Sequence, residues 1–571
     1  MGIIALIGTI AFIVIALAPL SKALSRIQQE KLEVITAEPK VEFDRSGILY
    51  LVIVSVIVAT TAFLINYFIL IRINLRYVGI IILAAITFLM VVNASYERLK
   101  IPLRLVLRIN RNVTIGLLVI LLGYALFGGR IYFHAEAYTE LIAVEEDVFN
   151  TDVETVDLET LPIVDKNYGA KLGALKLGEF PGIGSEFEPG GYSDILYQGK
   201  QYMVAPLEYR GLFKWLNNRS VGTPGYILID KVTAETKLIN LTDQEGLGLR
   251  YVPSAYFGDD LVRHAYYNGM HGYRLEDYYF EIDEDGRPYY VMQYSLPTIF
   301  VNGGDDVARI AVVDAITGEV NDYAPADVPD WVESVHPPML LLEQLDYWGT
   351  LQEGFLNRYF GQRGVLVPSQ GKRTIMNDDG LFYFTGLTSA GSDESTIGFV
   401  YMNTRTKETK LYKFAGATEA AAMNKAITLL PQNNISATFP VPLNVTDKPT
   451  YYILIKGEDG RILRHVFMNV QDLELSGMGT SKNSAYNAYV LSLGERDSEA
   501  FDTVEGTITH LDSYVTDGNT VFWVEIDDEE VYSLNVQRFG IEEMRGFMTK
   551  RVGDTIRFFA QDRRILELDE E

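Results

Sequence analysis

The chain of 571 residues contains no cysteine and only 6 histidines. The lack of cysteine excludes disulfides, thiolate nucleophiles and cysteine-ligated zinc or iron–sulfur sites. No HExxH and no GxSxG motif is present, so the signatures of zinc peptidases and of many serine hydrolases are missing as well. We therefore expect no cofactor, no metal site and no catalytic residues, and the sequence predicts a protein that is not an enzyme.

Charge is absent from four apolar runs near the start of the chain, at 2–20, 47–71, 77–95 and 113–129. Each run has the length and apolar character of a membrane-spanning helix. The first run could instead be a cleaved signal peptide, but no Lys or Arg precedes it. We therefore predict a four-helix transmembrane region over residues 1–133.

The distribution of basic residues predicts the orientation of this region. Loops 21–46 and 96–112 each carry five Lys or Arg residues, and the positive-inside rule places both loops in the cytoplasm. The protein is then expected in the cell membrane as a multi-pass protein, with its N-terminus and its large C-terminal region extracytoplasmic. That C-terminal region, 134–571, contains 36 Lys/Arg and 69 Asp/Glu. This acidic balance argues against nucleic-acid binding, which requires cations that neutralise phosphates.

Arg104, Arg108 and Arg111 lie at i, i+4 and i+7 in the second basic loop. Pro102 is suited to the first turn of a short helix. Two interpretations are open: an interfacial helix whose arginines contact anionic lipid, or a solvated loop that only supplies topology charges.

The apolar runs offer few groups for ion-coupled transport. Only Asn66 and Asn93 are strongly polar, and both lie near the ends of their runs. Carriers coupled to protons or sodium usually have ionisable residues within the membrane, so the runs favour an anchor. A pore formed by several copies is an alternative.

The first part of the extracytoplasmic region, 134–199, is expected to be an acidic stalk or linker leading into the folded part. Residues 145–157 are rich in acidic and β-branched residues. The glycine-rich run 178–192 lacks the strand-then-helix setting of a dinucleotide-binding loop, and we interpret it as a series of turns.

A short motif recurs beyond this region, in "YILIDKVTAETKLI" (226–239), "IAVVDAITGEVNDY" (310–323) and "FVYMNTRTKETKLY" (399–412). Each copy is an apolar strand, the pattern [DN]-x-x-T-x-E and a second strand, and "VFMNVQDLELSG" (466–477) is a degenerate fourth copy without the threonine. The motif residues are Asp230, Thr233, Glu235, Asp314, Thr317, Gly318, Glu319, Asn403, Thr406 and Glu408.

These oxygen-bearing residues suit either a site for metal or acid–base chemistry or a structural turn. Repetition along one chain favours the turn, because a catalytic site is seldom present three times. Asp or Asn at the start of a turn accepts hydrogen bonds from backbone N–H groups two residues on. Gly318 is suited to a positive φ.

The middle copy, "VVDAITGEV" (312–320), resembles the PepSY domain, and the other copies resemble it less closely because they lack the glycine. The resemblance implies small α+β modules that bind proteins or inhibit peptidases and are not enzymes. We expect two such PepSY-like regions, at 200–345 and 346–498. Helices are predicted at 258–270, 337–360, 416–430 and 479–493, and a hairpin at 278–294.

The last segment, 499–571, is expected to be a separate small all-β domain. Its strand and turn pattern gives the order β-β-β-α-β-β, which is that of an OB-like barrel. Residues 502–571 contain 17 Asp/Glu and 7 Lys/Arg, so nucleic acid is not the expected ligand. A contact with protein or glycan and a purely stabilising role are both open.

The sequence as a whole predicts a multi-domain chain: a four-helix transmembrane region, α+β PepSY-like modules and an OB-like barrel. The predicted function is that of a membrane-anchored extracytoplasmic scaffold or protein-binding protein that self-assembles or binds an envelope partner. The alternative is a subunit of an oligomeric channel or transporter. A carboxylate-dependent cell-wall enzyme is the third possibility, because Asp and Glu are plentiful.

Overall fold

The computed structural model describes most of the chain after residue 102 and five scattered positions before it, between 60 and 70. The spans predicted at 2–20 and 77–95, nearly all of the span at 47–71 and the loop 21–46 lie outside the described residues. Beyond 102, the positions that lie outside the described residues are 301, 370, 372, 378–379, 392–394, 459, 494–501, 517–518, 537–538, 540, 562 and 569–571.

Helix α4 (Leu103–Phe127) joins two segments that the sequence analysis kept apart. The short helix expected after Pro102 and the run 113–129 form one continuous helix, because no proline interrupts them and its two glycines each cost only about 1 kcal/mol. Arg104 lies in its first turn, and the side chains of Arg108 and Arg111 are exposed. Within the described residues, no helix combines the length and the hydropathy of a membrane span.

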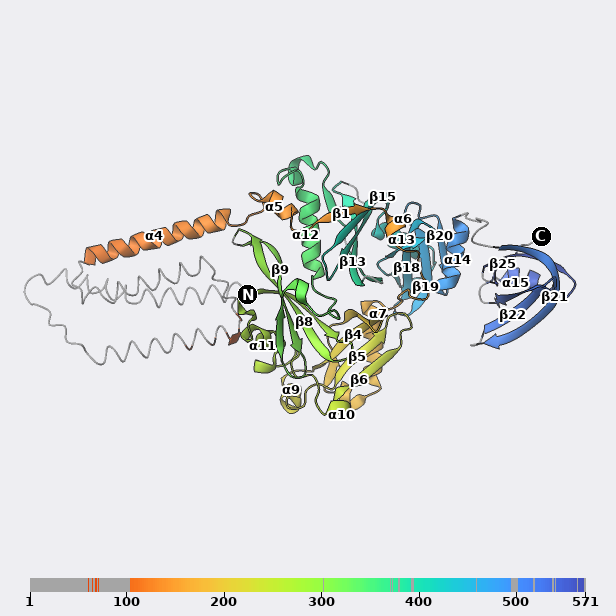
Figure 1. Cartoon of the computed structure of the whole chain (residues 1–571), viewed down its shortest axis with the longest axis horizontal. Coiled ribbons are helices and arrows are strands. Elements are labelled where there is room, and N and C mark those ends of the chain that lie inside the picture. The colour runs from red at the N-terminus through yellow and green to blue at the C-terminus, as the bar shows by residue number, and fades with distance from the viewer. Residues whose placement is uncertain are drawn as a thin grey trace, which may run out of the picture. The chain divides into compact units, whose positions relative to one another are not determined.

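Four sheets follow α4, each built on consecutive antiparallel strands (Figure 1). The first sheet contains β2 (Phe187–Pro189), β3 (Ser193–Tyr197), β4 (Lys200–Tyr209), β5 (Gly225–Asp230) and β6 (Thr236–Asn240). The second sheet contains β7 (Arg274–Ile282), β8 (Pro288–Ile299), β9 (Gly303–Asp314) and β10 (Val320–Tyr323).

The third and fourth sheets repeat this plan. The third contains β11 (Leu366–Pro368), β12 (Arg373–Asn377), β13 (Gly380–Ser389), β14 (Ser395–Asn403) and β15 (Thr409–Ala417), with β1 (Val144–Asp147) parallel to β15. The fourth contains β16 (Ile435–Ala437), β17 (Val441–Val445), β18 (Lys448–Gly457), β19 (Ile462–Asn469) and β20 (Ser476–Gly479). Each sheet thus contains one copy of the hairpin motif as its last two consecutive strands.

A helix precedes each run of strands: α7 (Lys166–Gly178), α11 (Leu261–Tyr267), α12 (Pro338–Leu351) and α13 (Glu419–Thr428). Three of these helices start at side chains that accept a backbone N–H, Asp165, Asp260 and Thr418. The fourth has proline at its start. The repeating unit is therefore a capped helix followed by an antiparallel meander.

Two predicted helices are shorter in the structure. The segment 258–270 is helical only as α11, preceded by the 3-10 turn Phe257–Asp259. Helix α12 stops at Leu351 because Gly354, with φ of +84°, turns the chain before Asn357–Gly361. The helices expected at 416–430 and 479–493 are present as α13 and as α14 (Lys482–Ser492).

The segment 134–199 is folded rather than a stalk. It contains α5 (Ala135–Thr139), α6 (Phe149–Asp152) and α8 (Pro181–Gly184) in addition to β1, α7, β2 and β3, so the glycine-rich run is not only turns. Its acidic residues pair with lysines of β15, as in the 2.9 Å contact between Lys410 Nζ and Asp152 Oδ1. These partners, distant in sequence, explain why the segment is ordered despite its charge.

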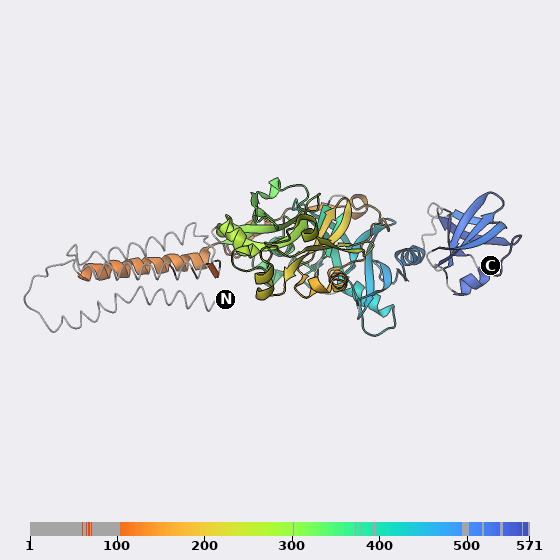
Figure 2. The same cartoon turned by 90° about the horizontal axis from the view of Figure 1, so that it is seen from below.

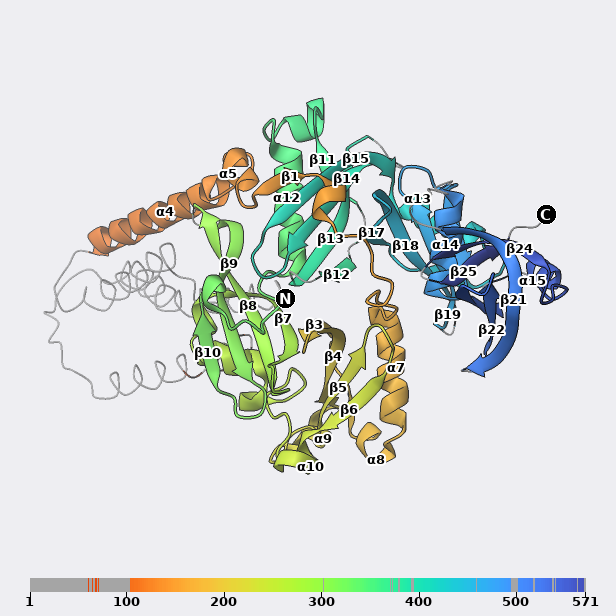
Figure 3. The same cartoon turned by 45° about the vertical axis from the view of Figure 1, so that its right-hand side comes forward.

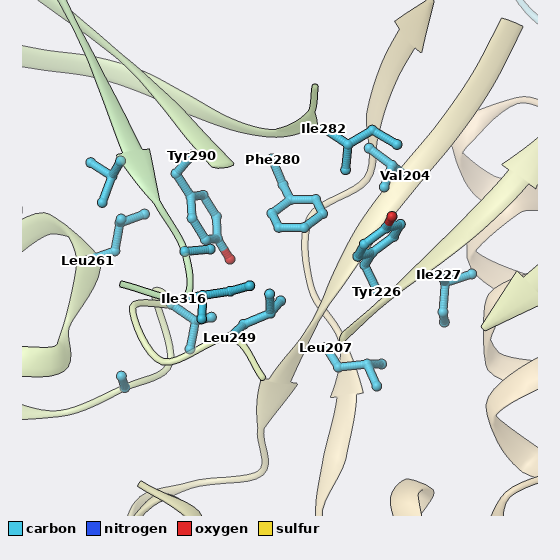
Figure 4. Packing of buried hydrophobic residues seen from close by; sticks show 14 of the residues in the cluster. Val204, Leu207, Tyr226, Ile227, Leu249, Leu261, Phe280, Ile282, Tyr290 and Ile316 are labelled. Atoms are coloured by element: carbon cyan, nitrogen blue, oxygen red, sulfur yellow. The ribbon is translucent and has the colours of Figure 1, made fainter. Parts of the chain in front are cut away.

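The sheets pack in two pairs around separate cores. The first and second sheets share a core in which the rings of Tyr226 and Phe280 lie 5.8 Å apart (Figure 4). The third and fourth sheets share another, in which the rings of Phe399 and Tyr451 lie 5.4 Å apart.

The last part of the chain forms a closed five-strand barrel, drawn in dark blue in Figure 2. Its strands are β21 (Asp502–Thr516), β22 (Asn519–Ile526), β23 (Glu530–Asn535), β24 (Thr555–Gln561) and β25 (Arg564–Leu568), with α15 (Ile541–Phe547) between β23 and β24. The long β21 pairs with both β22 and β24, which closes the barrel. The prediction of a small barrel in the order β-β-β-α-β-β is confirmed.

Candidate functional site

The predicted motif residues lie in three hairpin turns of the same geometry. In each turn, Oδ1 of the first residue accepts hydrogen bonds at 2.8–2.9 Å from the backbone N–H groups two and three residues on. The threonine Oγ1 accepts from the N–H of the glutamate at 3.3 Å. The three turns run from Asp230 to Glu235, from Asp314 to Glu319 and from Asn403 to Glu408.

The degenerate fourth copy forms a related turn. Asn469 Oδ1 accepts from the N–H groups of Gln471 and Asp472, and Asp472 Oδ1 accepts from the N–H of Glu474 at 3.0 Å. Asp472 thus takes the place of the missing threonine.

The turns do not assemble into one site. Within the described residues, no hydrogen bond or ion pair joins one turn to another, and each turn has its own neighbours. Asp314 accepts from Arg287 at 2.6 Å, whereas Lys407 of the third turn lies 2.8 Å from Asp306. This geometry favours a structural role for the motif.

The structure instead reveals a cleft of about 1000 Å³ lined by residues of all four sheets. The lining comes from the start of α7, from β3, β4, β7, β8, β12 and β13, and from the segment 434–439 with the end of β18. In Figure 3, β3, β4 and β7 lie on one side of this region and β12 and β13 on the other. The cleft therefore lies between the two pairs of sheets.

One end of the cleft is basic. It contains Lys166 and Lys171 of α7, Lys231 in the first turn, Arg373 of β12 and Lys456 of β18. We call these five residues the basic end.

Two carboxylates neutralise part of this charge. Lys231 Nζ lies 2.8 Å from Asp194 Oδ1, and both side chains are buried. Lys456 Nζ lies 2.8 Å from Oδ2 of Asp165, which also caps α7. Arg373 donates from Nη1 to the carbonyl of Phe439 at 2.6 Å.

The pKa values of these groups show how strongly they interact. Burial would raise the pKa of Asp194, but the charges of Lys231 and Lys166 hold that pKa below its usual value. Burial lowers the pKa of Arg373, although the carboxylates of Asp165 and Asp194 oppose the shift. The buried guanidinium is thus stabilised only in part by its surroundings.

Tyrosines and carboxylates line another part of the cleft, where β7 lies beside β3. Tyr278, Tyr279 and Tyr290 line it beside Glu208 and Asp277, and the hydroxyl of Tyr279 donates to Asp277 Oδ2 at 2.9 Å. The pKa of Glu208 is raised by burial and by the charge of Glu188. We call these five lining residues the acidic end.

Several buried polar atoms at the cleft lack partners. Within the described part of the chain, the hydroxyls of Tyr192 and Tyr290, which both line the cleft, have no hydrogen-bond partner. Buried polar groups are normally hydrogen-bonded, so such atoms in a cavity wall are available to a ligand.

The sequence did not predict the cleft. Its charged residues are spread from Asp165 to Glu458, and only Lys231 adjoins a predicted motif residue. The abundance of tyrosine, 35 in the chain, was the one visible signal. No group of three or more acidic or histidine side chains among the described residues is placed to hold a metal ion.

Comparison with known proteins gives no assignment. No family model matches the chain, and no curated protein matches it. The resemblance of 312–320 to PepSY therefore has no family model behind it. The structure establishes a multi-sheet α+β protein with a closed C-terminal barrel.

Proposed function

We propose that this protein is a membrane-anchored extracytoplasmic binding protein that holds a ligand or part of an envelope partner in the cleft between its two pairs of sheets. The observation that carries the proposal is the cleft itself, because all four repeats contribute to its walls and it holds buried polar atoms without partners. Concave sites with a few convergent polar groups are where proteins usually bind ligands.

The membrane part of the proposal rests on the uncharged runs of 1–133 and on a group of aromatic side chains that follows α4. The aromatic surface consists of Phe127, Tyr132, Phe133, Phe300 and Phe360, all of which are exposed. Aromatic residues are enriched at the membrane–water interface.

Ring contacts link the segment after α4 to two distant segments, because the ring of His134 lies 6.0 Å from the ring of Phe300 and Tyr132 contacts Phe355. The rings of Phe127 and Phe133 lie 5.4 Å apart, and the ring of Tyr132 lies 5.9 Å from that of Phe355. The hydroxyl of Tyr138 donates to the carbonyl of Gly129 at 2.7 Å, which fixes the chain just after α4. A lipid interface would cover side chains that are otherwise exposed to water.

The C-terminal barrel is OB-like in its strand order and supports a role in contacting a partner. Tyr514 of β21 and Trp523 of β22 are both exposed, and their rings lie 6.0 Å apart. Exposed aromatic residues often anchor protein contacts.

Photo-crosslinking of the full-length protein in native membranes tests the binding role. A photoreactive residue replaces Asn167, which is exposed at the cleft, and Leu175 serves as the control because it is exposed on the same helix but does not line the cleft. We expect a discrete adduct from position 167 and none from position 175.

Other results would redirect the proposal. Equal labelling at the two positions, together with a lone monomer after detergent extraction, would contradict it. Ion flux through the reconstituted protein would favour a channel subunit, and turnover of cell-wall polymer would show a carboxylate-dependent enzyme.

A further inference from the structure

We propose that the basic end of the cleft binds an anionic group of the ligand, a carboxylate or a phosphate, between Arg373 and Lys456. The inference rests on the proposed function, because it assigns a chemistry to the ligand of that cleft.

Charge counting at the basic end leaves a surplus of cations. Lys231, Arg373 and Lys456 face the carboxylates of Asp165 and Asp194, and Glu458 is a third carboxylate in this part of the lining. Lys166 and Lys171 add further positive charge in the same lining. An anion would therefore enter a region of net positive charge.

Arg373 is the cation without a carboxylate of its own. Among the described residues it forms no ion pair, and its Nη1 donates a hydrogen bond of 2.6 Å to the neutral carbonyl of Phe439. A guanidinium presents five N–H donors in a fork that fits carboxylate and phosphate oxygens. Arg373 is half-buried, and a partly desolvated charge without an ion-pair partner is unfavourable, so a bound anion would offset that cost.

Lys456 supplies the second contact. Its buried Nζ lies 2.8 Å from Asp165 Oδ2 and 5.3 Å from the centre of the Tyr168 ring. An ammonium has three donors, and among the described residues the carboxylate of Asp165 is the one ion-pair partner of Nζ. It can therefore contact an anion while it stays beside Asp165.

The acidic end directs the anion away from itself. Glu208 interacts with another carboxylate, Glu188, and with the hydroxyl of Ser254 rather than with a cation. Asp277 is held by the hydroxyl of Tyr279. Neither carboxylate forms an ion pair among the described residues, so an anionic group would be repelled from this part of the cleft.

Calorimetric titration of the full-length protein in detergent tests this inference. The probes are inorganic phosphate, a tripeptide with a free C-terminal carboxylate and the same tripeptide with an amidated C-terminus. We expect saturable binding of phosphate or of the free tripeptide, and at least tenfold weaker binding of the amidated form. Whichever anion binds identifies the group that the site prefers.

Two variants and a control locate the site. Arg373→Gln removes the unpaired cation, and the double variant Asp165→Asn with Lys456→Met removes both members of the ion pair without leaving a lone buried charge. Each should weaken binding at least tenfold, whereas Lys176→Met, on the outer part of α7 beside Glu179, should leave it unchanged. If Arg373→Gln does not fold, the double variant decides the matter.

The inference fails if neither anion binds saturably, or if a folded variant binds as tightly as the unaltered protein. Crosslinking from position 167 distinguishes this failure from that of the proposed function. An adduct at 167 without anion binding would leave the cleft as a binding site for a ligand of another chemistry.

Discussion

Gly318 and Ala234 occupy the same place in two of the repeated turns, and both have a positive φ, of +78° and +63°. Lys407 has a φ of +66° at this place in the third turn. Backbone conformation alone therefore does not require glycine there. A Cβ at Gly318 would lie 2.4 Å from the ring of Tyr251, and that ring packs against His264, which explains the glycine.

We expect opposite changes in the free energy of unfolding when alanine replaces Gly318 and when glycine replaces Ala234. Gly318→Ala should lower the free energy of unfolding by about 2 kcal/mol or more, because the methyl group overlaps the Tyr251 ring. Ala234→Gly should raise it by up to about 1 kcal/mol, because it relieves a left-handed conformation. Glu319→Gln, at an exposed position of the same turn, should change it by less than about 0.5 kcal/mol. Urea unfolding curves measure all three, and equal effects of the first two would refute the role of Tyr251.

Glu281 is a buried carboxyl in β7. It accepts hydrogen bonds from the backbone N–H groups of Glu333 and Ser334 at 2.9 and 3.0 Å. Burial nevertheless raises its pKa to about 7, with a further contribution from the charge of Glu333. The folded protein thus holds this proton more tightly than the unfolded chain does.

The stability contributed by Glu281 should therefore be full below about pH 4.5 and should disappear as the pH rises through about 7. Relative to Glu281→Gln, the unaltered protein should lose about 3 kcal/mol of unfolding free energy between pH 4.5 and pH 8. Two buried histidines, His336 and His465, have pKa values lowered to about 4 by burial. These histidines raise the free energy of unfolding as the pH rises from about 4 to 6.5. The unaltered protein and Glu281→Gln both contain them, so the difference between the two proteins isolates the effect of Glu281.

The control for this pH series is Glu284→Gln, which changes an exposed carboxylate in the turn after β7. Its stability should follow that of the unaltered protein at each pH. A pH-independent difference between the protein and Glu281→Gln would show that the buried carboxyl does not titrate in this range.

At the scale of elements, the third turn holds the segment of chain that connects the two pairs of sheets. The segment 328–336 leads from the second sheet to α12, and Arg405 donates to its carbonyls at Val328, Pro329 and Val332. Thr404 Oγ1 donates to the carbonyl of Glu333 at 2.7 Å. The sequence predicted this turn only as the end of a hairpin.

Arg405→Ala should therefore loosen the crossing segment more than it disturbs the hairpin. We expect a loss of about 2–3 kcal/mol of unfolding free energy, because several buried carbonyls lose a charged donor. Limited proteolysis should show faster cleavage within 325–337. Lys237→Ala removes an exposed ion pair with Glu235 and should change neither measurement noticeably, and equal cleavage in the two variants would contradict the role of Arg405.

At the scale of the whole molecule, the aromatic surface after α4 tests the proposed attachment to a membrane. Tryptophan introduced as Phe360→Trp, at a side chain that is 84% exposed, should be quenched by brominated lipids in nanodiscs. Phe213→Trp on α9 (Leu212–Asn218), where the side chain is 78% exposed, should not be quenched. Absence of quenching at both positions would contradict the contact with lipid.

The sequence by itself determined the features that depend on neighbouring residues. The hairpin turns could be predicted because Asp or Asn, threonine and glutamate satisfy one another's backbone groups within six residues. The barrel could be predicted because short alternating strands and turn residues define its order. The folding of 134–199 could not be predicted, because its acidic residues pair with lysines of β15 that are distant in sequence. The end of α12 at Leu351 was not predicted either, although Gly354, which turns the chain there, is close by in the sequence.

Only the tertiary structure decided the cleft, the reason for Gly318 and the titration of Glu281. Asp165 and Lys456 are nearly three hundred positions apart, yet their side chains lie 2.8 Å apart because two pairs of sheets meet there. Burial sets the pKa of Glu281, and a distant tyrosine ring excludes a side chain at position 318. Hydrogen-bonded turns are local in sequence, whereas burial and charge pairing depend on which surfaces the fold brings together.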